Sequence, residues 1–355
     1  MKNISWDLPD IGQEEIEAVI SSIKSEHLGG HGPNVKRFEK EFCNKIGVKH
    51  AIAVNNCTSA LLVSLYAMRE YLGTELKIAV PSFTFIASAN TAELVGEALL
   101  SDCSNKTWNM EVDHIPEKAN LLMPVDVGGL PVDYNSFKNT DLPIIADSAE
   151  SAGAKYNGQY VGSQADIHCF SFHRAKIITC GEGGMITTDN DELFEILESW
   201  CNHGYDYSKE NWQYRHIRLS MNCRMTDLEA AIGRVQLKKL DYYVNKRRER
   251  ADIYKKVLKG YVEFQHEPEN TYHPYFFFGI LIPGDNDSIC AKAERRGIKL
   301  KTWDPVHTQQ HFGNYKADLK NSCHIGNKVV LLPVHNKLSF DDTHFVAENI
   351  LSFLK

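Results

Sequence analysis

The chain has 355 residues, of which 43% are hydrophobic and 24% are charged, and its formal net charge is -7. This length favours two domains, the composition is typical of a globular protein, and the negative charge argues against a nucleic-acid-coating surface. No apolar run approaches the roughly 20 residues that span a bilayer, and residues 1–10 lack an apolar signal core, so we expect a cytoplasmic protein. The nine cysteines show no metal-ligand spacing, which predicts reduced thiols and no metal site.

The first two-thirds of the chain alternates helical and strand-like patterns. Strands that alternate with helices predict βαβ units and a mostly parallel sheet covered on both faces. Ligands of such sheets bind beyond the carboxyl ends of the strands, so the residues just after each strand matter most. The predicted elements are helices at 11–25, 34–46, 59–71 and 83–94, and strands at 50–54, 77–80, 97–101, 121–125, 142–146 and 167–172.

The last third of the chain has its own alternation of helices and strands. A long helix is predicted at 226–243 with Thr226 as its N-cap, and basic helical sequence continues to about residue 259. A strand at 275–282 and helices at 287–296 and 340–354 follow. We therefore predict an α/β fold with a large domain at residues 1–240 and a smaller C-terminal α/β domain at residues 241–355.

Two of the strand-end segments contain groups suited to a phosphate and to a planar ring. Thr58 and Ser59 form a hydroxyl pair at a helix N-terminus, where free amides and the helix dipole favour an anion, although an ordinary N-cap has the same sequence. Phe85 follows the strand at 77–80 and is placed to stack on a ring, or it is a core phenylalanine.

Two further segments contain a carboxylate and a lysine. Asp147 ends an apolar strand, where a buried acid needs a partner such as a protonated pyridine nitrogen, or else it is a helix N-cap. Lys176 follows Ser171 after another strand and is suited to a Schiff base beside a bound phosphate, or it is a surface charge. Together the four segments predict a site for pyridoxal 5'-phosphate (PLP).

At these residues the chain resembles the DegT-type sugar aminotransferases, a branch of the fold-type-I PLP enzymes. The resemblance extends from about residue 10 to the C-terminus, and the order and spacing of the matching segments make it specific. Those segments are Gly-Pro-Asn-Val-Lys-Arg-Phe-Glu at 32–39, Asn-Cys-Thr-Ser-Ala-Leu at 56–61, Pro-Ser-Phe-Thr-Phe at 81–85, Asp-Ser-Ala-Glu-Ser at 147–151, the glycine-rich run at 171–184, Met-Asn-Cys-Arg-Met-Thr-Asp at 221–227 and Pro-Val-His at 305–307.

The resemblance implies a fold-type-I PLP-transferase architecture and a role for each matching residue. Lys176 is expected to form the Schiff base and then to move a proton. The expected PLP contacts are Asp147 at the pyridine nitrogen, Phe85 on the ring, and Thr58, Ser59 and Ser171 at the phosphate. Asn222 is expected to reach the phosphate of a neighbouring subunit, which implies a homodimer with shared active sites. Glu150 stands where the family often has glutamine or histidine, so its contact is expected near the ring or the substrate.

The resemblance also implies a reaction. A sister group of sugar dehydratases has histidine in place of the lysine, so Lys176 favours transamination. The turn at 179–184 is similar to that of enzymes acting on 4-keto sugars. We therefore predict amino transfer from L-glutamate to a nucleotide-linked 4-keto-6-deoxy sugar, for amino sugars of surface glycans such as O-antigen lipopolysaccharide, or of antibiotics. His173, Arg218 and His307 are the predicted substrate contacts, and Arg215, Arg218 and Lys301 are candidates for the pyrophosphate.

Three alternatives remain at this stage. The acceptor is a 3-keto sugar instead, or the chain is a non-catalytic regulator with a PLP fold. An NAD(P)-dependent oxidoreductase is the third, but it requires a glycine-rich turn after the first strand, and residues 54–58 contain no glycine.

Overall fold

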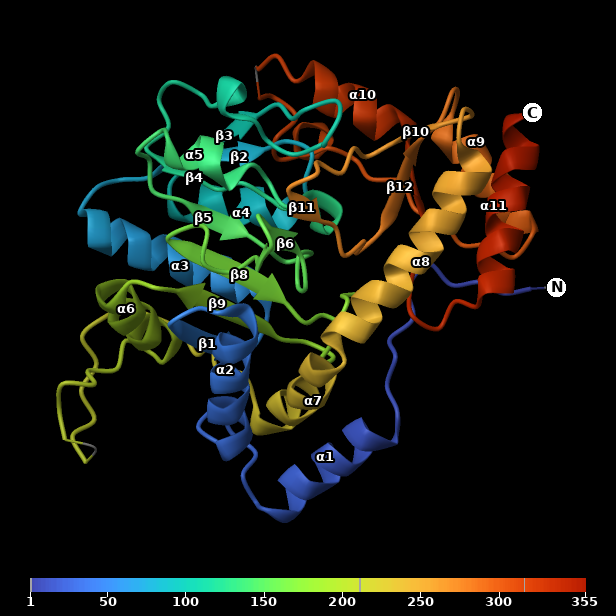
Figure 1. Ribbon diagram of the computed structural model, residues 1–355. Helices are drawn as coiled ribbons and strands as arrows, with labels where there is room; N and C mark the ends of the chain where they lie inside the picture. The colour runs from blue at the N-terminus through green and yellow to red at the C-terminus, as the bar shows by residue number, and fades with distance from the viewer. Residues whose placement is uncertain (1, 211, 316) are drawn as a thin grey trace.

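The computed structural model describes residues 2–210, 212–315 and 317–355, and Figure 1 shows its arrangement. A four-stranded and a three-stranded sheet, in the orders β1-β9-β8-β5 and β3-β2-β4, are joined by parallel bridges from Leu122 to Ile144 and from Val125 to Asp147. Among the residues that the structure describes, β9 is the only strand of this joined sheet that runs antiparallel to its neighbours. Its strands are β1 (His50–Val54), β2 (Lys77–Pro81), β3 (Glu97–Ser101), β4 (Leu121–Leu122), β5 (Ile145–Asp147), β8 (Ile167–Ser171) and β9 (Gly184–Thr188).

Helices cover both faces of this sheet, so the side chains on both faces are buried. Successive side chains of one strand point to opposite faces and therefore enter different apolar clusters. On β8, Cys169 packs into the apolar cluster that contains α3, whereas Phe170 packs against Phe42 of α2 on the other face. The helices around the sheet are α1 (Gln13–Lys24), α2 (Pro33–Ile46), α3 (Cys57–Leu72), α4 (Ile86–Val95), α5 (Tyr134–Lys138), α6 (Asp191–Cys201) and α7 (Asp227–Lys238).

The C-terminal elements surround a second, antiparallel sheet in the order β10-β12-β13. Figure 1 shows the long helix α8 running diagonally from the end of α7 to these elements. Ile4, near the start of the chain, packs into their apolar cluster and forms a bridge with Ile298. The elements are α8 (Leu240–Leu258), β10 (Glu263–Phe264), β12 (Phe278–Leu281), α9 (Asn286–Arg295), α10 (Lys320–Lys328), β13 (Val329–Leu332) and α11 (Phe340–Leu354).

A small three-stranded sheet combines strands from both regions of the sequence. It has the order β11-β6-β7, so β11 (Thr271–Tyr272) pairs with β6 (Lys155–Tyr156), which in turn pairs with β7 (Gln159–Tyr160). The predicted domain division at residues 240 and 241 stays a prediction. No helix among the described residues is both long enough and apolar enough to cross a membrane.

Several predicted elements differ from those observed. The helix predicted at 226–243 is wrong as one element, because α7 ends at Lys238 and α8 begins at Leu240. The helix predicted from residue 83 begins only at Ile86, since Phe85 is its extended N-cap, with φ -67° and ψ 142°. The strand predicted at 121–125 is reduced to Leu121–Leu122, and α6, α10, β9 and β13 were not anticipated.

Gly184 is the residue at which β9 meets the start of α3. It pairs with Ser171 at the end of β8 and with Val54 at the end of β1. A Cβ atom at this position would lie 2.8 Å from the carbonyl carbon of Asn56 and 2.9 Å from the amide nitrogen of Cys57. Because both contacts are with backbone, a side chain here would displace the N-terminus of α3.

The substitution Gly184→Ala is therefore expected to lower the free energy of unfolding by about 2 kcal/mol, as measured by urea denaturation. Gly29→Ala is the matched control, because a Cβ atom there meets nothing within 4 Å. Equal urea midpoints for the two variants would contradict the prediction that a side chain at Gly184 displaces the start of α3.

Candidate active site

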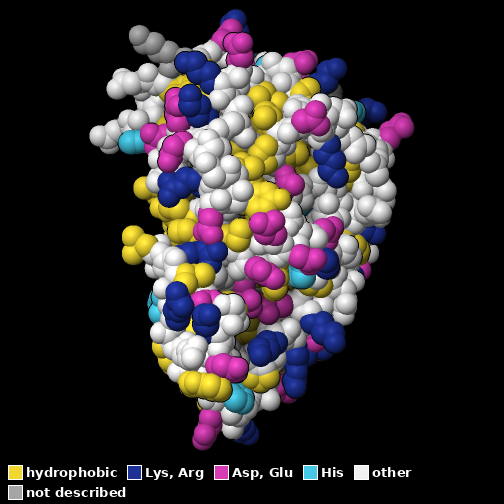
Figure 2. All heavy atoms as spheres, turned by 90° about the vertical axis from the view of Figure 1, so that its left-hand side faces the viewer, with side chains coloured by type: hydrophobic (Ala, Val, Ile, Leu, Met, Phe, Trp, Pro, Cys, Tyr) yellow, Lys and Arg dark blue, Asp and Glu magenta, His cyan; other side chains and the backbone are white. Residues whose placement is uncertain are grey.

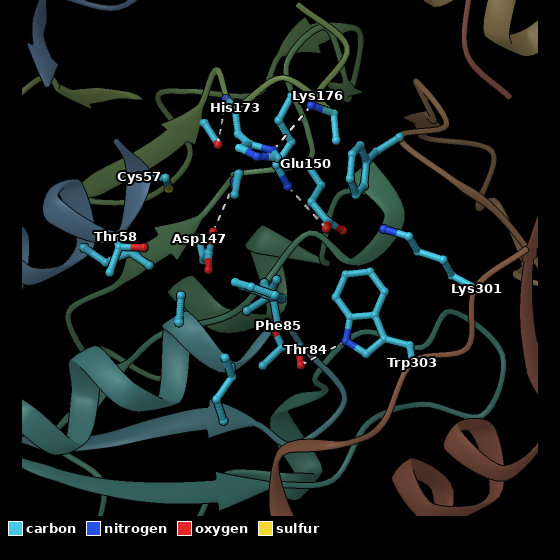
Figure 3. A pocket seen from close by; sticks show the side chains of 18 of the residues that line it. Cys57, Thr58, Thr84, Phe85, Asp147, Glu150, His173, Lys176, Lys301 and Trp303 are labelled. Carbon is cyan, nitrogen blue, oxygen red and sulfur yellow. Dashed lines mark hydrogen bonds and ion pairs between the residues drawn. The ribbon is translucent and has the colours of Figure 1, made fainter. Parts of the chain in front are cut away.

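A cavity of about 550 Å³ lies at the carboxyl ends of β5 and β8, and Figure 3 shows it from close by. Segments from both ends of the chain form its walls. The lining residues that the sequence predicted are Thr58, Phe85, Asp147, Glu150, Ser171, His173 and Lys176, together with the pyrophosphate candidate Lys301.

Lys176 lies in the loop between β8 and β9. Two backbone hydrogen bonds close this loop, from the Phe172 amide to the Gly183 carbonyl (2.8 Å) and from the Cys180 amide to the Phe172 carbonyl (2.9 Å). The Lys176 amide donates to the His173 carbonyl at 2.9 Å. The lysine is thus held on an ordered turn that follows directly from the central sheet.

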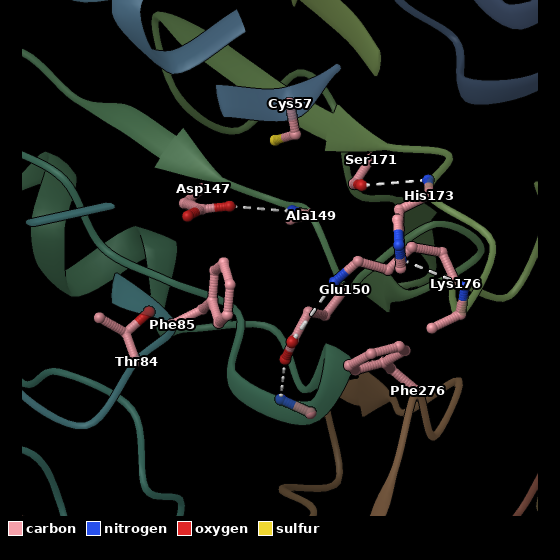
Figure 4. A network of polar contacts seen from close by, with 12 residues as sticks. Cys57, Thr84, Phe85, Asp147, Ala149, Glu150, Ser171, His173, Lys176 and Phe276 are labelled. Carbon is pink, nitrogen blue, oxygen red and sulfur yellow. Dashed lines mark hydrogen bonds and ion pairs between the residues drawn. The ribbon is translucent and has the colours of Figure 1, made fainter. Parts of the chain in front are cut away.

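Lys176 lines the cavity, and Figure 4 shows its amine directed at the Glu150 carboxylate. Its Nζ atom lies 3.5 Å from Oε1 of Glu150 and 4.0 Å from the centroid of the Phe276 ring. The side chain is only 15% exposed. The alternative that Lys176 is a solvated surface charge is therefore wrong.

Glu150 links this lysine to the segment that follows β4. Its Oε2 atom accepts a hydrogen bond of 2.8 Å from the Gly128 amide, and Gly128 has φ +71°. Burial raises the pKa of Glu150, and the charge of Lys176 opposes that rise. The carboxylate holds the amine within the cavity.

Asp147 is the last residue of β5 and is 4% exposed. Ser88 Oγ donates to its Oδ2 at 2.7 Å, and the Ala149 amide donates to its Oδ1 at 3.1 Å. No helix follows Asp147 within the turn 148–154, so it is not an N-cap. Burial raises the pKa of Asp147, and a cation beside it would favour its ionised form.

The N-terminus of α3 forms another wall. Asn56, and not a hydroxyl of Thr58 or Ser59, caps the helix, because Asn56 Oδ1 accepts from the Ser59 amide at 2.8 Å. Asn56, Cys57 and Thr58 line the cavity, whereas Ser59 does not. The amides of a first helical turn have no partner within the helix, so this wall is suited to an anion.

Phe85 brings an aromatic ring to the cavity. It is 61% exposed, so the alternative that it is a core residue is wrong. Its ring meets that of Trp303 edge to face, with centroids 6.3 Å apart. Trp303 is fixed by a hydrogen bond of 3.1 Å from its Nε1 atom to the Thr84 carbonyl. One ring face is thereby available to a planar ligand.

Three other predicted site residues do not line the cavity. Arg218 forms an ion pair of 2.5 Å with Glu70. His307 is hydrogen-bonded through Nδ1 to Ser82 Oγ at 2.6 Å, next to the lining residue Val306. Asn222 is exposed elsewhere on the surface.

Of the other two pyrophosphate candidates, Arg215 also lies outside the cavity lining, with its Nε atom 3.9 Å from Asp206 Oδ2. Lys301 lines the cavity, with Nζ 4.3 Å from the centroid of the Trp6 ring. Several other lining residues were not singled out from the sequence. Thr84 and Glu182 lie within two of the matching segments but were given no role there, whereas Trp6, Phe276, Trp303, Asp304 and Gln309 come from segments far from the four strand ends.

The chain is similar to sugar aminotransferases over nearly its whole length. A GDP-perosamine synthase from Escherichia coli O157:H7 is 31% identical, with 99% of each chain covered. A UDP-4-amino-4,6-dideoxy-N-acetyl-beta-L-altrosamine transaminase from Campylobacter jejuni is 29% identical, covering 99% of this chain and 98% of that one. The solved structure of Helicobacter pylori PseC, an aminotransferase involved in pseudoaminic acid biosynthesis, superposes with a TM-score of 0.93 at 26% identity, over 99% of each chain.

These likenesses confirm the predicted fold class and the predicted enzyme class, and they exclude the oxidoreductase. The family match covers residues 9–351. The chain therefore belongs to the DegT/DnrJ/EryC1/StrS aminotransferase family.

Proposed function

We propose that this aminotransferase uses PLP to move an amino group from L-glutamate to the C4 keto carbon of a nucleotide-linked 6-deoxy sugar. The proposal rests on one observation: four kinds of group line a single cavity. They are the Lys176 amine, the buried Asp147 carboxylate, the exposed Phe85 ring and the N-terminus of α3. The aminotransferases of this family depend on PLP, which agrees with that set of groups.

The residues around the cavity fit PLP by their chemistry. Asp147 is suited to the pyridine nitrogen, because its buried carboxylate is more stable as an anion beside a cation. Phe85 offers a ring face, and Thr58 and Ser171 with the first amides of α3 offer phosphate ligands. The Ser59 amide is already bonded to Asn56 Oδ1, so Ser59 would reach the phosphate only through its hydroxyl, after a change of rotamer. When bound, PLP supplies a carbonyl that accepts the amino group and a ring that accepts electrons.

Lys176, Glu150, Phe276 and Ser88 have different roles in proton transfer. Lys176 Nζ takes a proton from the substrate carbon and returns it. Glu150 holds that amine in place through its 3.5 Å contact, and Phe276 keeps water from one side of it. Ser88 fixes the direction of the Asp147 carboxylate. Because donor and acceptor react in turn at the same place, the kinetics are ping-pong.

The identity of the sugar is supported by the named relatives. The GDP-perosamine synthase and the transaminase both carry nucleotide-sugar names, and the name of the transaminase contains a 4-amino-4,6-dideoxy sugar. In this chain, Glu182 of the turn 179–184 lines the cavity, and so does Lys301, which is suited to an anionic group of the substrate. We infer from these points a 4-keto-6-deoxy acceptor and a product used in surface-glycan or other amino-sugar biosynthesis.

A homodimer with shared active sites is part of the proposal. Large hydrophobic side chains are exposed at residue 207 and within residues 212–221, among them Trp212 (76%), Tyr214 (87%) and Leu219 (97%). Hydrophobic side chains also gather between charged ones on the face shown in Figure 2. Exposed apolar surface of this kind is typical of an interface, and Asn222 lies directly after it in the sequence. A second copy would cover this surface and receive Asn222 at its own cavity.

The first test concerns the lysine. Wild-type protein with PLP is expected to show an absorbance band near the visible edge that L-glutamate bleaches. Lys176→Ala is expected to lower kcat/KM by about a thousandfold or more, because it removes both the covalent anchor and the proton-transfer group. Lys299→Ala, at an exposed lysine, is the control and should retain activity. Full activity of Lys176→Ala would overturn the assignment.

The second test concerns the substrate. Wild-type enzyme is offered L-glutamate with a panel of dTDP-, UDP- and GDP-linked sugars carrying a keto group at C4 or at C3. The products are analysed by mass spectrometry and NMR. We expect an amine at C4 of a 6-deoxy sugar. Turnover of the C3 keto sugars alone would overturn the C4 assignment while leaving the aminotransferase assignment intact.

The third test concerns the shared site. Lys176→Ala and Asn222→Ala are each expected to be inactive as pure dimers. After the two proteins are unfolded and refolded as a mixture, mixed dimers contain one site with both residues intact, so about a quarter of the wild-type activity should return. A mixture as inactive as its components, although light scattering shows dimers, would mean that Asn222 serves its own subunit.

A further inference from the structure

Asp126, which follows β4, has a buried carboxylate beneath the turn that contains Asp147 and Glu150. It is 1% exposed and does not line the cavity. Its Oδ2 atom accepts from Ser151 Oγ at 2.6 Å and from Ser148 Oγ at 3.2 Å. Its Oδ1 atom accepts from the Val132 amide at 3.0 Å, and the Tyr134 hydroxyl lies 2.8 to 2.9 Å from both oxygens.

The hydrogen bonds continue from Asp126 to β8 with a defined direction. Nε2 of the buried His168 accepts from the amides of Gln164 (3.1 Å) and Ala165 (3.0 Å), so the ring proton is on Nδ1. Nδ1 then donates to Ser148 Oγ at 2.9 Å, and the Ser148 hydroxyl is left to donate to Asp126. Burial lowers the pKa of His168 to about 3, so this ring is neutral at neutral pH.

The backbone around Asp126 holds the same turn at further points. The Asp126 amide donates to the Asp147 carbonyl at 3.2 Å, and the Gly128 amide donates to the Glu150 carboxylate. Gly129 has φ +94°, and a Cβ atom there would lie 2.6 Å from the Glu150 carbonyl oxygen. Residues 126–129 therefore hold the turn through Asp147, Ser148, Glu150 and Ser151.

The charge of Asp126 matters as well as its shape. Burial raises its pKa to about 6, against the opposing effect of its hydrogen bonds, so the carboxylate is mostly ionised at neutral pH. Burial and Asp126 itself raise the pKa of Tyr134, so the facing hydroxyl keeps its proton. Other titratable groups around this network are the neutral His168, Lys138, whose charge acts on His168, Tyr156, whose ring packs against that of Tyr134, and the carboxylates of Asp147 and Glu150. The carboxylates of Asp126 and Asp147 thus lie on two paired segments, the one that follows β4 and β5 itself, at one side of the cavity.

We propose that Asp126 is a positioning residue for the reaction, which fixes the turn 147–151 through Ser148 and Ser151 and adds its negative charge to that of Asp147. This inference rests on the proposed PLP chemistry. It predicts that Asp126 sets how tightly PLP is held and how strongly protons are held on the bound cofactor, although it contacts neither cofactor nor substrate.

The test uses apoenzyme reconstituted with PLP. The dissociation constant is measured by absorbance titration, and the pH midpoint of the cofactor band is measured on the loaded protein. Asp126→Asn removes the charge and is expected to weaken PLP binding about tenfold and to lower the midpoint by about one pH unit, because an anion stabilises nearby cationic forms. Ser151→Ala removes one hydrogen bond and keeps the charge, so binding should weaken about fivefold with an unchanged midpoint.

Asp133→Asn is the matched control, because Asp133 also accepts from a serine and a tyrosine but does not contact the turn. It should change neither quantity. The inference is overturned if Asp126→Asn equals this control, or if Ser151→Ala shifts the midpoint as far as Asp126→Asn does. If Asp126→Asn does not fold, the double variant Ser148→Ala/Ser151→Ala decides, since unchanged PLP affinity there overturns the inference. A wild-type protein without a PLP band would overturn the proposed function itself, and this inference with it.

Discussion

The burial of two carboxylates on one short turn is the constraint on which the site depends. Taking an ion out of water costs several kcal/mol unless donors and an opposite charge replace the water. Around Asp147 and Glu150 these partners are Ser88, the amides of Gly128 and Ala149, and Lys176. Each comes from a different segment, so the turn, α4, the segment after β4 and the loop after β8 must be placed together.

The parallel pairing of β5 with β8 brings these groups to one edge of the sheet. Asp147 pairs with Cys169, so the turn after β5 and the loop after β8 begin at nearly the same level. Gly184 lets β9 and the start of α3 approach closely at the same edge. The positions of the lysine, the carboxylates and the N-terminus of α3 at one edge of the sheet therefore depend on one strand register. A shift by one residue would turn Asp147 away from the cavity.

The C-terminal elements complete the site that the sheet begins. Phe276 covers the Lys176 amine, and Trp303 packs against Phe85. Lys301 lies over the ring of Trp6, a residue near the start of the chain. The wall opposite the sheet is thus aromatic, and it excludes water from one side of the amine.

Local patterns predicted most elements of the sheet region because strands and helices there have distinct apolar periods. The break between α7 and α8 was missed, since Leu237, Leu240 and Tyr243 are all buried and the helical period continues across it. The sequence also named eight residues of the cavity lining, seven of them from the strand-end segments, but most of the other lining residues were not named. The predicted roles of those residues, and the domain division at 240 and 241, stay predictions.

The sequence by itself determined the fold class and the family. It also determined which segments contain the lysine, the carboxylate and the hydroxyl groups suited to a phosphate, because each of these features is a contiguous motif with local spacing. Only the tertiary structure decided that Lys176 pairs with Glu150, that Phe85 is exposed and that Arg218 pairs with Glu70 outside the cavity. It alone revealed Asp126 beneath the turn. These features depend on contacts between residues far apart in the chain, and no local pattern specifies which distant side chains will meet.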